Sequence, residues 1–228
     1  MTIQTYWHKI RNEVLVAQKT ISRPLFLADG MPRSGSTLVY NYLRLCLTER
    51  YGPTVESGWI GDIKEFPSAE AYCVKAHGVS RLLYSRAKFS CYTYRDLRVA
   101  LVSGLRKFGR KPNIATCQSF IRKDQLARKH ATIVFKYEEI LANKRVTIER
   151  LIDALEVNTT SSTIEEALSR QITLGISEGE RQRDTQMHGG HATGTKDGDW
   201  RDVLDGEFLS ELHDKYSWWF EANDYPIK

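Results

Sequence analysis

The chain has 228 residues, of which 41% are hydrophobic and 27% are charged, and these ordinary proportions exclude a globally disordered protein. The length allows one sizeable domain with a core of its own. The formal net charge of +5 at pH 7 indicates an anionic partner: nucleic acid, a membrane surface or a phosphate-bearing small molecule.

The first part of the chain has the pattern of a helix, a strand, a loop and a second helix. Apolar residues recur at helical spacing within 7–17, which predicts the first helix. A proline then precedes a short continuous apolar run at 25–28, typical of a buried parallel strand. This run leads into the glycine-containing loop 29–37, and helical spacing resumes over 39–46. Strand, glycine loop and helix form the opening of a nucleotide-binding unit.

The middle of the chain repeats the alternation of strand and helix. Apolar runs at 71–75, 89–94 and 131–135 predict three further buried strands. The second of these is followed by apolar residues at helical spacing over 97–108, and the third by a similar pattern over 148–155. This alternation predicts an α/β fold with a central parallel sheet and helices on both faces.

The last part of the chain changes in composition. Residues 177–205 are polar and glycine-rich and predict a long loop, which in a compact domain is usually functional or disordered. An apolar and aromatic pattern then predicts a helix over about 206–222. We find no internal repeat. We therefore expect a single P-loop-type domain over 1–228, with its ligand-binding core at about 24–157.

The cysteines and the N-terminal sequence indicate in which cellular compartment the protein resides. The four cysteines show neither CxxC spacing nor pairing with a histidine cluster, and three of them lie inside apolar segments, as buried free thiols do. The N-terminus lacks the apolar run of a signal peptide, and no apolar stretch is long enough to span a bilayer. We expect a reduced, cytoplasmic protein without metal and without membrane association.

The loop after the first strand has the glycine spacing of a Walker A motif, at Gly30 and Gly35, with Ser36 and Thr37 following. A Walker A loop needs a lysine directly after the second glycine, to reach the β- and γ-phosphates of a nucleotide. Here that position is Ser36, and the cation stands earlier, at Arg33. The loop keeps a phosphate nest and a helix N-terminus, but it lacks the group that holds a nucleoside triphosphate. A plain glycine turn without a ligand is the alternative.

Four segments together resemble a known family. Residues 31–38 resemble the 5′-phosphosulfate loop of the sulfotransferases that use 3′-phosphoadenosine 5′-phosphosulfate (PAPS). Residues 94–103 resemble the 3′-phosphate motif of that family, 137–140 its Tyr-Glu-Asp-Leu segment, and 198–201 its late Gly-Asp-Trp-Lys signature. The resemblance spans residues 25–205. It implies transfer of a sulfuryl group from PAPS to an acceptor hydroxyl or amine, with 3′-phosphoadenosine 5′-phosphate (PAP) as product and no metal.

The resemblance also implies catalytic roles. Arg33 would stabilise the leaving oxygen of the donor. The Lys-Ala-His sequence at 75–77 resembles the family's Lys-Thr-His, so His77 would be the base that takes the acceptor's proton, with Lys75 beside it. A carboxylate, Glu65 or Asp62, is the alternative base.

Donor binding is implied for a second set of residues. Arg95 and Ser103 would bind the 3′-phosphate that distinguishes PAPS from ATP, and Ser103 is also a catalytic candidate. Tyr137 would contact the adenine ring or pack in the core. Together with Arg33, the remaining donor-binding candidates are Ser34, Gly35, Ser36, Thr37, Leu38, Lys107, Thr193 and Lys196.

Two other functions remain open at this stage. A small P-loop nucleotide or metabolite kinase would need an acidic Mg²⁺ ligand, for which Asp96 is available. A non-catalytic module that binds phosphate or nucleic acid is suggested by the basic run at 106–111. The preferred function is a sulfotransferase acting on a small-molecule or glycan acceptor rather than on nucleic acid. Residues 50–70 are expected to help form the acceptor pocket, and the oligomeric state stays open.

Overall fold

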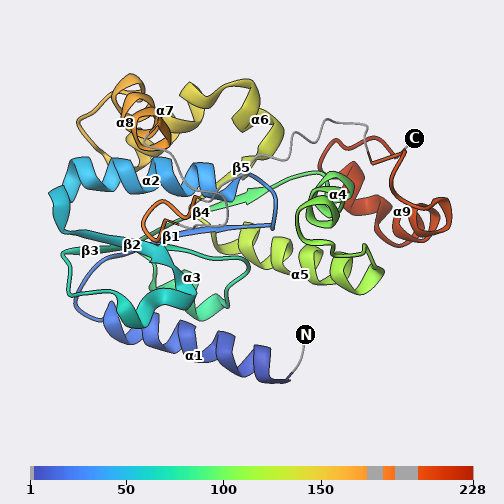
Figure 1. Cartoon of the computed structure of the whole chain (residues 1–228), viewed down its shortest axis with the longest axis horizontal. Helices are drawn as coiled ribbons and strands as arrows, with labels where there is room; N and C mark the ends of the chain where they lie inside the picture. Colours follow the sequence, from blue (N-terminus) through green and yellow to red (C-terminus); the bar gives the residue numbers. More distant parts are fainter. Residues whose placement is uncertain (1–2, 174–181, 188–199, 228) are drawn as a thin grey trace.

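The computed structural model describes residues 3–173, 182–187 and 200–227, and the statements below concern these residues. Five strands form one parallel sheet in the order β2-β3-β1-β4-β5 (Figure 1). The strands are β1 (Leu25–Gly30), β2 (Val55–Trp59), β3 (Ala71–Lys75), β4 (Phe89–Tyr94) and β5 (Ile133–Lys136). The predicted parallel sheet is confirmed.

The strands that form the middle of the sheet are those that the apolar runs predict. All six residues of β1 and all five of β3 are buried, because each strand has a neighbour on both sides and helices on both faces. β5 lies at an edge and begins two residues later than the apolar run. β2, at the other edge, was not predicted, because its sequence Val-Glu-Ser-Gly-Trp is mostly half-buried and has no continuous apolar run.

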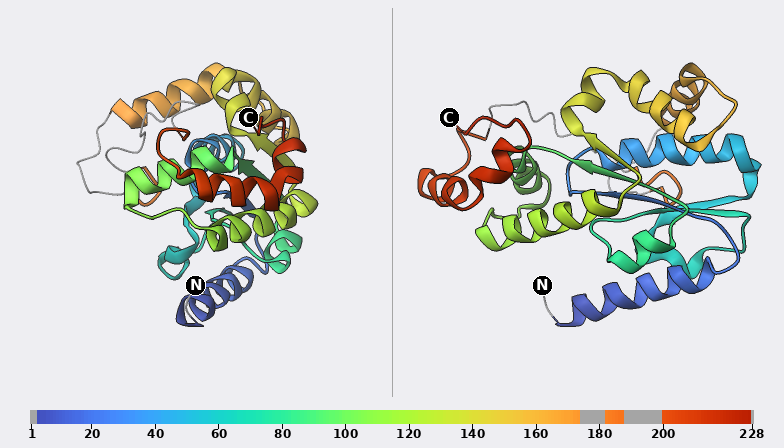
Figure 2. Two further views of the ribbon diagram at one scale, coloured as in Figure 1. Left: turned by 90° about the vertical axis from the view of Figure 1, so that its right-hand side faces the viewer. Right: turned by 180° about the vertical axis from the view of Figure 1, so that it is seen from behind.

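Helices cover both faces of the sheet, as the alternation of elements predicts (Figures 1 and 2). One face carries α2 (Ser36–Tyr51), with α7 (Lys144–Leu155) and α8 (Ser161–Thr173) packed on it. The opposite face carries α1 (Ile3–Lys19), α3 (Arg81–Arg86) and α5 (Ile114–His130). The other elements are η1 (Gly52–Thr54), η2 (Ile60–Glu65), α4 (Leu97–Phe108), α6 (Tyr137–Ala142) and α9 (Gly206–Glu221).

The core divides into a cluster on each face of the sheet. Leu43 of α2 and Phe26 of β1 belong to the first cluster, whereas Leu27 of β1 and Val16 of α1 belong to the second. Alternate side chains of β1 thus point to opposite faces. Each such side chain contributes roughly 1.5–3 kcal/mol on burial, so the central strand is held firmly where its end carries the phosphate loop.

The first helix turns a different face inward from the one its apolar residues suggest. Trp7 is 63% exposed and Val14 41% exposed, whereas Val16 and Glu13 are buried. The Glu13 carboxylate accepts hydrogen bonds from the backbone N–H of Ser80, the N-cap of α3. This polar contact with a helix N-terminus orients α1 and leaves part of its apolar stripe in solvent.

All four cysteines are buried free thiols, as expected for the three that lie in apolar segments. No helix in the described ranges is long and apolar enough to cross a membrane.

The strand order changes direction at β1, and this switch point lies at the edge of the sheet formed by the carboxyl ends of the strands. β1 is followed in the sequence by strands on one side of it and then, from β4 onward, by strands on the other. The region beyond the carboxyl ends of the strands, next to such a switch point, is where α/β sheets bind ligands. The loops after β1, β3, β4 and β5 all meet at this edge.

Candidate active site

The loop after β1 presents the uncapped N-terminus of α2. Gly35 is the N-cap residue, in the left-handed region with φ 75° and ψ 11°, and no side chain caps the helix. Arg33 also has a positive φ of 70°. The first-turn N–H groups, including those of Ser36 and Thr37, therefore lack intrahelical acceptors and carry the positive end of the helix dipole. This arrangement is suited to binding a phosphate or sulfate group.

Ser34 holds the loop in shape from within. Its hydroxyl lies 2.6 Å from the carbonyl oxygen of Met31 and 2.6 Å from the hydroxyl of Thr93 on β4. Its backbone N–H donates to Met31 as well. Ser34 is fully buried, so its polar groups stabilise the loop in the ligand-free protein.

Leu38, one helical turn inside α2, packs its side chain against the core on that face of the sheet. Its backbone N–H donates to the carbonyl oxygen of Gly35 at 2.9 Å. The side chain is therefore a packing group in this structure, and the expected donor contact of Leu38 stays a prediction.

Three cationic or polar side chains from separate segments meet beside the loop. The guanidinium Nε of Arg33 donates to the hydroxyl of Ser103 on α4 at 2.8 Å. Arg95, at the end of β4, approaches the carbonyl oxygen of Arg33 at 3.5 Å and is 4% exposed. Burial and then the nearby Arg95 lower the pKa of Arg33. The structure thus brings together the two predicted arginines and the serine eight positions after Arg95, and concentrates positive charge where an anion would bind.

Tyr137 covers this cluster from the end of β5. The Arg95 guanidinium stacks on its ring at 4.1 Å from the centroid. A Cβ on Gly35 would lie only 2.7 Å from the same ring, so the loop and the tyrosine pack closely. The ring is half-buried and lines the loop rather than the interior of the core.

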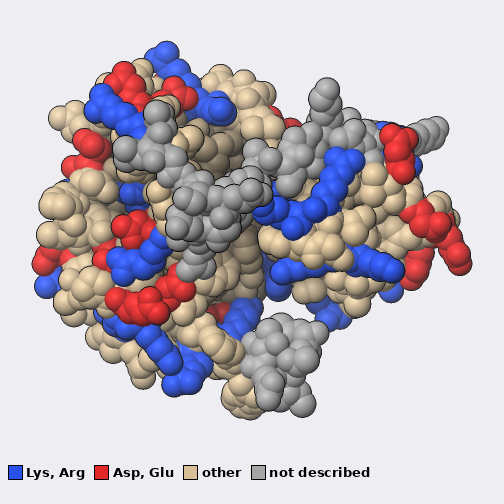
Figure 3. All heavy atoms as spheres, viewed as in Figure 1, with Lys and Arg blue, Asp and Glu red and all other residues tan. Residues whose placement is uncertain are grey.

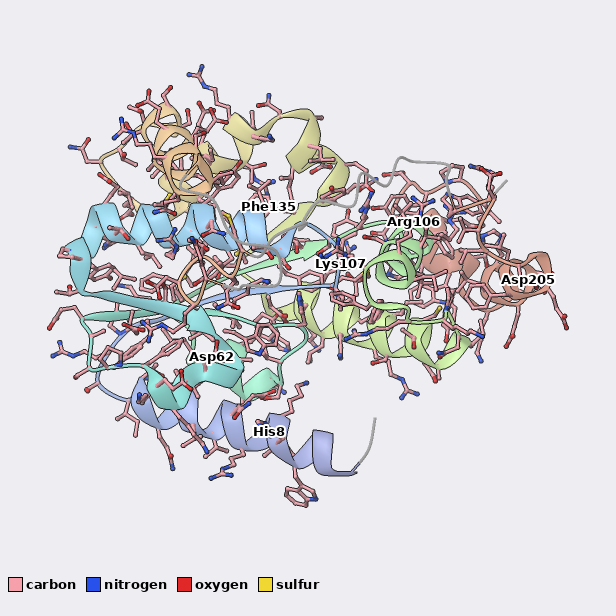
Figure 4. The ribbon with its side chains drawn as sticks, viewed as in Figure 1. His8, Asp62, Arg106, Lys107, Phe135 and Asp205 are labelled. Carbon is pink, nitrogen blue, oxygen red and sulfur yellow. The ribbon has the colours of Figure 1, made fainter. Side chains whose placement is uncertain are left out.

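The end of α4 adds positive charge near the loop. Figure 4 shows Lys107 on the side of α4 that faces β1. Arg106 lies on the same helix but farther from β1. Phe108 links this helix to the loop, because the Arg33 guanidinium lies 5.9 Å from its ring centroid. The structure therefore places Lys107 on the same side as the predicted donor-binding arginines.

His77 follows β3, the neighbour of β1. Its Nδ1 lies 2.8 Å from the carbonyl oxygen of Gly30. A carbonyl oxygen only accepts, so Nδ1 carries the hydrogen and donates it, which leaves Nε2 with a free lone pair. The Trp59 ring, from the end of β2, lies 5.3 Å from the imidazole between ring centroids.

The surroundings of His77 keep its imidazole neutral. Burial lowers its pKa to about 3, and the charges of Lys75, Lys123 and Arg33 act in the same direction. Lys75 itself is 6% exposed, and its ammonium lies 5.8 Å from the Trp59 ring centroid. A neutral imidazole among cations has the protonation state that a general base requires.

The two alternative bases lie on η2, beyond the end of β2. Glu65 is exposed and Asp62 is partly buried. Figure 4 shows Asp62 on η2 next to α1, on which His8 is labelled. Because β3 separates β2 from β1 in the sheet, the loop carrying His77 is the nearer one to the phosphate loop.

Asp29, the penultimate residue of β1, supports the site and was not predicted from the sequence. It is 1% exposed and accepts hydrogen bonds from the backbone N–H groups of Gly78 and Val79 and from the Tyr84 hydroxyl. These bonds fix the turn that directly follows His77. A carboxylate ending an otherwise apolar buried strand was the available signal, because a buried charge requires several donors.

Asp96 is engaged in the interior. It caps α4 by accepting from the backbone N–H of Arg98, and it pairs with the Arg98 guanidinium at 2.7 Å. Arg98 is 1% exposed and stacks on Trp200 at 4.1 Å from the ring centroid. Trp200 is 5% exposed and packs in a buried cluster with Val99 and Val102. Because these bonds occupy both carboxylate oxygens of Asp96, the residue is not available as a Mg²⁺ ligand.

The late-loop candidates Thr193 and Lys196 lie outside the described residues, as do the glycine and aspartate before Trp200. Their expected contacts with the donor stay predictions.

Comparisons with known proteins place this site in context. No protein-family model matches the chain, and no curated protein matches it by sequence. Among solved structures, retinol dehydratase in complex with retinol and PAP matches with a TM-score of 0.55 at 14% identity, covering 84% of this chain and 80% of that one. Retinol dehydratase with androsterone and the inactive cofactor PAP matches with a TM-score of 0.52 at 14% identity, covering 90% and 84%.

The chain has the fold of retinol dehydratase. At this identity the likeness establishes the fold, an α/β unit with a parallel sheet between two layers of helices.

Proposed function

We propose that the chain is a sulfotransferase that moves a sulfuryl group from PAPS to an acceptor hydroxyl or amine. One observation carries the proposal. Arg33, Ser103 and Arg95 lie together beside the uncapped N-terminus of α2. The helix N-terminus and this cluster provide two adjoining sites for anionic groups, on a loop that lacks the Walker A lysine. PAPS carries a 5′-phosphosulfate and a 3′-phosphate, which fit a site of this kind.

The proposed binding mode assigns each phosphate to a group of residues. The α2 N-terminus would hold the 5′-phosphosulfate, since helix N-terminal N–H groups and an arginine both favour anions. Arg95 and Ser103 would hold the 3′-phosphate, and Tyr137 would lie near the nucleoside. The PAP in both retinol dehydratase structures supports this assignment for a chain of the same fold.

The proposed reaction is an in-line displacement at sulfur. The acceptor oxygen or nitrogen forms a bond to sulfur while the bond from sulfur to the bridging oxygen breaks, and that oxygen leaves with the electron pair as part of PAP. His77 Nε2 takes the acceptor's proton, a step typically worth 10²–10⁴-fold in rate. Arg33 and Lys75 stabilise the charge on the leaving oxygen. The negative charge of the donor also offsets the cations around His77 and makes its imidazole more basic.

A small-molecule or glycan acceptor and a cytoplasmic location complete the proposal. Retinol and androsterone in the two matching structures are small molecules. The four buried free thiols agree with a reducing compartment.

Isothermal calorimetry with PAP and with ATP tests donor recognition. We expect PAP to bind without Mg²⁺ and at least about tenfold more tightly than ATP, because only PAP carries the 3′-phosphate. Arg95→Ala should weaken PAP binding by about 10- to 100-fold, whereas Arg110→Ala, changed at an exposed position beyond α4, should leave it unchanged. Tighter binding of ATP in the presence of Mg²⁺ would overturn the proposal and favour a kinase.

A further inference from the structure

Lys123 of α5 lies across the turn that follows His77. Gly78 in this turn has a positive φ of 74°, and a Cβ there would lie 2.9 Å from Cε of Lys123. Glycine at this position therefore serves two purposes: it allows the left-handed backbone, and it leaves room for the aliphatic part of the lysine. The aliphatic part of Lys123 therefore packs against the turn that directly follows His77, and the charge of its ammonium group lowers the pKa of His77.

The charge of Lys123 has no counter-charge in direct contact. Among the described residues, its ammonium makes neither a hydrogen bond nor an ion pair within contact distance. Partial burial lowers its pKa, the nearby Lys9 of α1 lowers it further, and Asp29 acts in the opposite direction. Asp29 is nevertheless occupied by the backbone of the His77 turn, as described above.

Lys9 strengthens the positive character of this corner. It belongs to α1, and its ammonium is 3.7 Å from the carboxylate of Glu13. The Glu13 carboxylate also accepts hydrogen bonds from the backbone N–H of Ser80, so it is shared between Lys9 and Ser80. The charge of Lys9 on α1 thus disfavours the charged form of Lys123 on α5, and a bound anion would offset this repulsion.

This corner is separate from the proposed donor site. The donor-binding groups follow β1, β4 and β5, whereas His77 follows β3, on the other side of β1. Lys123 reaches His77 from α5, which with α1 covers the face of the sheet opposite α2. Figure 3 shows Lys and Arg side chains bordering a hollow at the centre of one face of the molecule.

We propose that Lys123, assisted by Lys9, binds a negatively charged group of the acceptor, so that the acceptor is an anionic hydroxyl or amino compound. The carboxylate, phosphate or sulfate of such a compound would contact Lys123 while its nucleophile faces Nε2 of His77. The inference rests on the proposed function, because it names the acceptor class of the same site. Binding of an anionic acceptor group would give the half-buried Lys123 a function beside His77, although the charge of Lys123 reduces the proton affinity of that base.

Matched pairs of compounds test the inference on protein loaded with PAP. The probes are 4-hydroxybenzoate with its methyl ester and glucuronate with glucose, and binding is measured by ligand-observed NMR. PAP loading fills the donor site and is verified first by calorimetry. A protein that does not bind PAP refutes the proposed function, whereas the pairs report on the acceptor site alone.

We expect the anionic member of at least one pair to bind about tenfold more tightly than its uncharged analogue. Lys123→Gln should abolish this preference and leave PAP affinity within about twofold of wild type, and Lys123→Arg should retain the preference. Lys129→Gln, at an exposed position on the same helix, is the matched control and should change neither. Equal or tighter binding of the uncharged members, no binding by either member of any pair, or a preference that survives Lys123→Gln would overturn the proposal.

Discussion

The neutral state of His77 has a measurable consequence for stability. Its folded pKa of about 3 lies below the value of about 6.5 for an unfolded chain. As the pH falls below 6.5, the unfolded chain binds a proton that the folded protein does not, so the folded state loses stability. His77→Gln removes this titration and keeps a side-chain N–H that can donate to the carbonyl oxygen of Gly30.

The size of the effect follows from the same two values. Below the unfolded pKa, each pH unit costs about 1.4 kcal/mol, so the interval from pH 7.5 to pH 5 costs at most about 2 kcal/mol. The imidazole of His77 is only partly buried, and solvent reduces the cost, so we expect about 1 kcal/mol. The loss would continue until the pH approaches 3.

Urea unfolding at pH 7.5, 6 and 5 measures this cost in the ligand-free protein. Wild type should lose about 1 kcal/mol more than His77→Gln between the extremes, because the other titrating groups are common to both proteins. His8→Gln, at an exposed position on α1, controls for loss of a histidine as such. Parallel loss of stability in wild type and His77→Gln would refute a neutral imidazole at His77 in the folded protein.

Three further substitutions test the geometry of the site. Gly35→Ala should lower the free energy of unfolding by about 2–4 kcal/mol and abolish PAP binding in calorimetry. Alanine is strained at a φ of 75°, and its Cβ would lie 2.7 Å from the ring of Tyr137. A PAP affinity near that of wild type would contradict the loop structure. Asp29→Asn should lower kcat about tenfold or more with little change in PAP affinity, since the turn after His77 loses one of the two carboxylate oxygens that accept its hydrogen bonds, and an amide NH2 donor takes its place; a fall in PAP affinity alone would be the contrary result. Arg98→Met should destabilise the protein by about 3–5 kcal/mol in urea unfolding by leaving the buried Asp96 without its partner, and an unchanged midpoint would contradict this.

The fold was predictable where the sequence carries strong local patterns. β1, β3 and β4 were found because central parallel strands are buried on both faces and read as continuous apolar runs. β2 was missed because an edge strand is only half-covered. α5 was missed because its buried positions include the charged Asp124, which gives a weak apolar stripe.

The candidate site was predictable where a motif carries it. The loop spacing and the resemblance identified Arg33, Arg95 and His77, and the structure brings the two arginines together and places His77 on the neighbouring strand. Asp29 and Lys123 were not found, because their roles depend on contacts between segments far apart in the sequence. A carboxylate that binds a turn some fifty residues later, at Gly78, leaves no periodic signal. The extent of the single domain stays a prediction.

Transfer of labelled sulfate from PAPS tests the central claim most directly. The protein is incubated with sulfate-labelled PAPS and a mixture of phenols, sugars and amines, anionic and uncharged, without added metal. The account predicts labelled acceptor and an equal amount of PAP, with most of the turnover lost in His77→Ala while calorimetry shows PAP binding nearly intact. Failure to transfer label to any acceptor, together with Mg²⁺-dependent phosphoryl transfer from ATP to the same mixture, would contradict it.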